Sequence, residues 1–102
     1  MSRSKLEEYL DILEVLVPQS FKFKEISHKA DIEGKTLKRH LDFLISHGLV
    51  DRASIERERN AYAITDMGLA VLRTLQANEY LEKIYQSILR SHMYEERIHV
   101  YS

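Results

Sequence analysis

Apolar residues recur at helical spacing in three stretches of the chain, and these stretches predict its longest elements. The first runs from Ser4 to Val17, where a wide apolar stripe indicates a helix that packs against other elements. Its members are Leu6, Tyr9, Leu10, Ile12, Leu13, Leu16 and Val17. Ser4 and Glu7 have the spacing of a capping box, so we expect the helix to begin there. Pro18 disfavours its continuation.

The second stretch, from Phe23 to Val50, predicts a short helix, a tight turn and a longer helix. The longer helix spans about residues 34–47, and its apolar face consists of Leu37, Leu41, Leu44 and Ile45. Gly48 follows where a positive φ is favoured, so we expect it to end the helix and Leu49 to fold back. Two helices joined by about four residues form a helix-turn-helix, and the second of them is its recognition helix.

Short alternating segments lie on either side of this motif and predict strands. Phe21 and Phe23 flank Lys22 in such an alternation. Residues 50–65 predict a β-hairpin with a polar turn at 58–60, where Asn60 best tolerates the left-handed conformation.

The third helical stretch follows Thr65, which we expect to cap a helix from Asp66 to the early nineties. At ~1.5 Å per residue this helix is ~40 Å long, more than a body of this size covers. An approximate heptad seam runs along it through Ala70, Ala77, Leu81, Ile84 and Ile88. The last residues, 96–102, are expected to form a tail or a short strand.

Composition narrows the class of protein. The chain has 102 residues, 44% hydrophobic and 30% charged, as expected for one ordinary globular domain. It has no cysteine, which excludes disulfides and Cys-based zinc sites, and no apolar run that could span a bilayer. We therefore expect an intracellular, cytoplasmic protein that does not associate with membranes. The net charge of −1 excludes a wholly basic protein, yet residues 21–60 carry nine Lys and Arg against seven Asp and Glu.

The order helix, strand, helix-turn-helix, hairpin and closing helix is that of a winged-helix domain, an α+β and mainly helical fold. The runs HLDFLISHGLV (40–50) and YAITDMGLAVL (62–72) resemble those of small winged-helix transcription regulators. The resemblance is to PadR-like and MarR-like groups and to small dimeric DNA-binding proteins of archaea and their viruses. It implies a winged-helix domain at 1–75, continuous with a long dimerisation helix at 66–95. Glu33 departs from the pattern, because many relatives have Ser or Thr there.

A winged helix of this kind implies a double-stranded DNA partner, with the recognition helix in the major groove and the wing, about 50–65, against the backbone or minor groove. The candidate contacts are the cations and the threonine that this geometry places toward DNA. They are Lys35, Thr36, Lys38 and Arg39 on the recognition helix, Arg57 and Arg59 on the wing, and Lys22 and Lys24 before the first helix of the motif. The alternative is a solvated charged surface.

Apolar residues beyond the needs of one small core predict a homodimer, whose two-fold axis would match a palindromic operator. The candidate interface consists of Leu6, Tyr9, Leu10, Leu13, Leu81, Ile84, Tyr85 and Ile88. The alternative is a monomer whose last helix bends back over its own core.

Catalytic and metal-binding motifs are absent from the sequence, so we expect neither an enzyme nor a cofactor. His40 and His47 are two helical turns apart, too far for the usual ligand pair, and we expect them, like His28, to be surface or semi-buried residues. Six tyrosines are compatible with a small-molecule effector, but no motif supports one. We thus predict a sequence-specific transcriptional regulator; the alternative is a winged-helix protein–protein interaction module that does not bind DNA.

Overall fold

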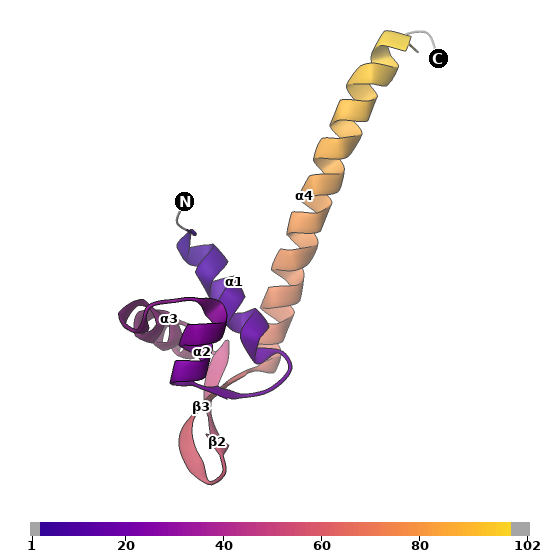
Figure 1. Cartoon of the computed structure of the whole chain (residues 1–102). Coiled ribbons are helices and arrows are strands. Elements are labelled where there is room, and N and C mark those ends of the chain that lie inside the picture. Colours follow the sequence, from indigo (N-terminus) through magenta and orange to yellow (C-terminus); the bar gives the residue numbers. More distant parts are fainter. Residues whose placement is uncertain (1–2, 99–102) are drawn as a thin grey trace. The chain divides into compact units, whose positions relative to one another are not determined.

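The computed structural model of the protein consists of helices and one small antiparallel sheet (Figure 1). It describes the backbone of residues 3–98 and the side chains of residues 3–91. The elements are α1 (Lys5–Leu16), β1 (Phe21–Lys22), α2 (Phe23–Ala30), α3 (Gly34–Ser46), β2 (Val50–Ile55), β3 (Glu58–Ile64) and α4 (Asp66–Ile98). They form two compact units, one ending at Leu72 and the other beginning at Arg73. This is the expected winged-helix arrangement with a long C-terminal helix.

The start of α1 is fixed by the predicted capping box. The backbone N–H of Glu7 donates to Oγ of Ser4 at 3.1 Å, and the backbone N–H of Ser4 donates to Oε1 of Glu7 at 3.3 Å. These bonds satisfy N–H groups that a helix start otherwise leaves unpaired. The helix ends at Leu16, before Pro18, as predicted.

The core of the first unit lies between α1, α2, α3 and the sheet. Each helix contributes the apolar face that its period predicts. Fully buried members with large side chains are Ile12, Leu13, Leu16, Ile26, Leu37, Leu41, Leu44, Val50 and Leu72. Leu72 belongs to the first turns of α4, so this part of α4 helps to complete the core of the first unit.

The end of α3 is a glycine-stabilised cap. Gly48 has φ of +72°, its N–H donates to the carbonyl of Ile45 at 3.0 Å, and the N–H of Leu49 donates to the carbonyl of Leu44 at 2.9 Å. This pair of bonds is a Schellman motif, which satisfies the last carbonyls of the helix. The predicted helix stop and the backward turn of Leu49 are both confirmed.

The sheet has the strand order β1-β3-β2, with Phe21 opposite Tyr62 in one pair and Val50 opposite Ile64 in the other. The predicted wing is therefore present, but its turn was placed wrongly. Residues 58–60 belong to β3, and the two turn residues are Glu56 and Arg57, with φ of 53° and 71°. Positive φ at both central positions is the requirement of a type I′ turn, whose twist matches the two strands that it joins. Because Ile55 pairs with Glu58, the turn lies at these two residues, although Asn60 tolerates a positive φ better.

Phe23 was predicted both at the end of a short strand and at the start of the helix-turn-helix, and in the structure it begins α2 instead of extending the strand. The backbone N–H of Lys22, at the N-cap position, donates to Oε1 of Glu25 at 3.0 Å. This bond to a carboxylate three residues later starts the helix immediately after the two-residue strand.

Thr65 connects the end of α3 with the start of α4. Its hydroxyl donates to the carbonyl of Gly48 at 2.6 Å and accepts the N–H of Gly68 at 2.9 Å. The predicted N-cap is thus confirmed. Gly68 is needed at this junction, because a Cβ there would lie 2.1 Å from the carbonyl oxygen of Leu49.

The α4 helix has 33 residues and extends through Ile98, so residues 96–98 of the expected tail are helical. Residues 99–102 lie outside the described residues. Over residues 73–91 of α4, no described side chain is buried, and only Leu75 and Ile84 are half-buried. None of the helices in the described part of the chain combines the length and the hydropathy needed to cross a membrane.

Candidate nucleic-acid interface

The recognition helix α3 has one buried and one charged face. Leu37, Leu41 and Leu44 are fully buried in the core. The opposite face is exposed and carries Lys35, Lys38, Arg39 and Asp42, while Thr36 is half-buried. Lys38 and Asp42 form an ion pair within the helix, with Nζ and Oδ2 3.6 Å apart. The cations predicted to face DNA thus share one accessible surface, at the three- and four-residue spacing of a single helix face.

A buried histidine on α3 contacts α1. His40 is 5% exposed, and its Nε2 atom lies 2.9 Å from Oε1 of Glu8. The ring of Tyr9 meets His40 edge-on with centroids 4.7 Å apart. His40 is thus more buried than the surface or semi-buried position expected for it, because it lies on the α1 side of α3. His28 and His47 are exposed, as expected, and no group of three His, Asp or Glu among the described residues could hold a metal ion.

Arg3 joins α1 to the end of α2. Its Nη1 atom donates to Oδ2 of Asp11 at 2.5 Å and to the carbonyl of Ala30 at 2.8 Å, and its Nη2 atom donates to the carbonyl of Asp31. The hydrogen bond to Asp11 raises the pKa of Arg3. These contacts fix the first helix of the motif against α1. The sequence held no signal for them, since the partners are far apart along the chain.

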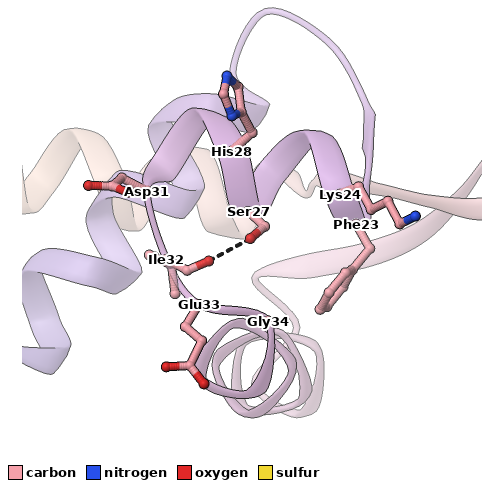
Figure 2. A pocket seen from close by; sticks show the side chains of 8 residues that line it. All are labelled: Phe23, Lys24, Ser27, His28, Asp31, Ile32, Glu33 and Gly34. Atoms are coloured by element: carbon pink, nitrogen blue, oxygen red, sulfur yellow. Dashed lines mark hydrogen bonds between the residues drawn. The ribbon is translucent and has the colours of Figure 1, made fainter.

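The turn between α2 and α3 contains one residue in the left-handed conformation and one side-chain hydrogen bond. Asp31 has φ of 54°, and Oγ of Ser27 donates to the carbonyl of Ile32 at 2.6 Å (Figure 2). Ile32 is buried and anchors the turn. Glu33 is the N-cap of α3, and its side chain makes no capping hydrogen bond.

A pocket lies against this turn, as Figure 2 shows. Lys24 and Phe23 line one side of it, and the carboxylates of Asp31 and Glu33 point away from them. The lining includes two acids and one lysine, a charge balance that is unfavourable for a negatively charged ligand. We therefore do not interpret the pocket as a phosphate site.

The wing presents its arginines at the tip. Arg57 occupies the second turn position and Arg59 lies in β3, and both side chains are exposed. Glu58 lies between them and pairs with Lys22, with Oε2 and Nζ 3.6 Å apart. Arg52 lies over the ring of Tyr62 at 5.6 Å and is a wing cation that the sequence analysis did not select. Lys24 is exposed at the start of α2.

The residues predicted for a dimer interface separate into two groups. Leu10 and Leu13 belong to the core of the first unit, where Leu13 is only 1% exposed, so they offer almost no surface to a second copy. Tyr9 is half-buried and stacks on Phe43 with centroids 4.8 Å apart. Leu6 is 52% exposed. The exposed members on α4 are Leu81, Tyr85 and Ile88, with Ile84 half-buried.

Comparison with known proteins agrees with this geometry. A family model described as winged helix-turn-helix matches residues 2–90. A search of curated proteins finds no match.

Three solved structures illustrate the similarity. Sso10a-2, a DNA-binding protein from Sulfolobus solfataricus, is 23% identical with a TM-score of 0.63, over 95% of this chain and 97% of that one. A MarR family transcriptional regulator from Silicibacter pomeroyi is 19% identical with a TM-score of 0.61, over 85% and 73% of the two chains. The transcriptional regulator BldR from Sulfolobus solfataricus is 26% identical with a TM-score of 0.60, over 80% and 60%.

Proposed function

The chain belongs to the winged helix-turn-helix family, and on that premise we propose that it is a sequence-specific, double-stranded DNA-binding transcriptional regulator that acts as a homodimer. In this proposal α3 enters the major groove, and the wing contacts the backbone or the minor groove. Relatives of the same fold described as a DNA-binding protein and as transcriptional regulators support the assignment.

The observation that carries the proposal is the composition of the exposed face of α3. Lys35, Lys38 and Arg39 project from a helix whose opposite side is locked into the core. Arg and Lys are the side chains that pair with guanine in the major groove, and both neutralise phosphates. Lys38 pairs with Asp42, and Lys35 lacks the planar guanidinium that can bind a base edge through two donors, so Arg39 is the residue that we select for base contact.

Dimerisation is proposed through α4. Leu81 and Ile88 are 59% and 58% exposed, a high value for large apolar side chains at the spacing of a heptad seam. Tyr85 lies beside this seam and widens it. A second copy that covers the same residues would remove them from water, and the resulting two-fold axis would present two recognition helices to one palindromic site.

The same apolar strip supports the second candidate function, a protein–protein interaction module. In that case the partner on α4 would be a different protein, and the cations of α3 would be a solvated surface. The two functions are distinguished by whether the protein binds a DNA duplex.

The test is fluorescence anisotropy of the purified protein on a mixed-sequence duplex, at low and at high salt. We expect binding that weakens steeply with salt, because each phosphate neutralised by Lys or Arg releases counterions. After selection of a preferred site, Arg39→Ala should cost about 1–3 kcal/mol on that site, the usual value of a good base contact.

Arg90→Ala is the matched control, since Arg90 is an exposed arginine on α4, outside the proposed DNA surface. It should leave the affinity unchanged. If the wild type binds no duplex even at low salt, or if Arg39→Ala retains full affinity and selectivity, the DNA-binding assignment in this form is wrong and the interaction module is favoured.

A further inference from the structure

The carboxylate of Glu58 lies among the cations of the wing and contacts two polar side chains. Oε2 of Glu58 lies 3.6 Å from Nζ of Lys22 and accepts a hydrogen bond from Nδ2 of Asn60 at 3.1 Å. Asn60 is two residues further along β3, and this hydrogen bond shows that its side chain lies beside that of Glu58. Lys22 belongs to β1 and caps α2. The ion pair thus joins the wing to the start of the helix-turn-helix motif.

This pair differs from the other ion pair on the proposed DNA surface. Lys38 and Asp42 are neighbours on one helix, so their pairing follows from their spacing alone. Lys22 and Glu58 lie on different strands, and the antiparallel pairing of β1 with β3 brings them together. The side chains of Lys22 and Glu58 are 39% and 63% exposed, so the pair is accessible to a DNA backbone.

The contact has a direct consequence for DNA binding. A lysine that neutralises Glu58 cannot at the same time neutralise a phosphate, so Lys22 adds little to counterion release while the pair persists. If Lys22 moves to a phosphate, Glu58 is left as an uncompensated negative charge beside the backbone. Both states weaken the attraction to phosphates whatever the base sequence.

Resting on the function proposed above, we infer that Glu58 is a positioning residue for Lys22 that sets the strength of sequence-independent DNA binding. It withholds one phosphate contact, that of Lys22. The selection of a particular site then depends more on the base contacts of α3, because less of the affinity comes from the backbone.

The test uses Glu58→Gln in the full chain, titrated onto a mixed-sequence duplex over a range of salt concentrations. Glutamine keeps an acceptor for Asn60 and removes the charge. We expect the low-salt affinity to rise about two- to tenfold, and the slope of log affinity against log salt to steepen by about 0.9, the contribution of one added phosphate contact.

Two further variants separate an effect through Lys22 from a general effect of charge. Glu56→Gln removes the same charge from the neighbouring turn and should leave the salt slope unchanged. The double variant Lys22→Met, Glu58→Gln should return the slope to that of the wild type, and Lys22→Met alone should change it little. Circular dichroism would verify that all variants retain the fold.

Equal slopes for the wild type and Glu58→Gln would overturn this inference and leave the proposed function intact. An affinity gain that persists in the double variant would also overturn it, because Glu58 would then act without Lys22. Absence of binding by both the wild type and Glu58→Gln at low salt would overturn the proposed function, and this inference with it.

Discussion

The two compact units of the chain have apolar patterns that look alike in the sequence and differ in what covers them. In the unit that ends at Leu72, the periodic leucines of α1 and α3 are buried by neighbouring elements, except Leu6 at the start of α1. In the unit that begins at Arg73, the described apolar side chains of α4 remain largely exposed. A helical period therefore shows which face of a helix is apolar, but it does not show which element or molecule covers that face.

The difference has an energetic meaning. The first unit can offset its loss of conformational entropy by burying apolar surface within one chain. A single helix in water lacks this gain and is marginally stable at best. We therefore expect the helix of the second unit to depend on a partner, while the first unit folds on its own contacts.

The largest expected effect is a core truncation in the first unit. Leu37→Ala should lower the free energy of unfolding by about 2–5 kcal/mol, because the side chain is fully buried and its removal leaves a cavity. Urea denaturation followed by circular dichroism measures this loss. A change below about 1 kcal/mol would mean that Leu37 is not part of a closely packed core.

A leucine truncation in the second unit tests whether its exposed apolar side chains are covered by a second copy. Leu81→Ala should weaken self-association by at least about tenfold, since the exposed leucine is expected to be buried only in the dimer. Sedimentation equilibrium measures the association, and the unfolding of the first unit should be much less affected than by Leu37→Ala. A wild type that is monomeric at micromolar concentration would contradict the dimer.

The smallest expected effect is in the wing, the part of the first unit with the least burial. Glu56→Asn should stabilise the fold by up to about 1 kcal/mol, because asparagine tolerates the positive φ of this turn position better than glutamate. Ser54→Asn is the matched control on the exposed part of β2, where the φ is not positive, and should give no gain. Thermal unfolding compares the two, and equal stability would argue against the type I′ turn.

Local signals in the sequence predicted the helix ends well. The Ser4 capping box, the Gly48 stop and the Thr65 cap each depend on residues within a few positions of one another. The wing turn was displaced, because the register of the hairpin shifts between Ala53 and Ile55 and pairs Ile55 with Glu58, which leaves Glu56 and Arg57 as the turn residues.

In the proposed site, too, the features that follow from local sequence could be predicted and those that join distant residues could not. The exposed face of α3 follows from its helical period, so Lys35, Lys38 and Arg39 could be selected from the sequence. The contact of His40 with Glu8 and that of Lys22 with Glu58 could not, because each joins residues more than 30 positions apart. Likewise, the burial of Leu10 and Leu13 depends on how α1 packs, which their period does not specify.

The junction at Thr65 has a consequence for local fluctuations of the first unit. The N–H of Thr65 donates to the carbonyl of Leu49, and its hydroxyl connects Gly48 with Gly68. The end of α3, the root of the hairpin and the first turn of α4 therefore share one set of hydrogen bonds. We expect them to open as a single cooperative unit, so that their amides are protected from hydrogen exchange together, while those at the wing tip exchange independently.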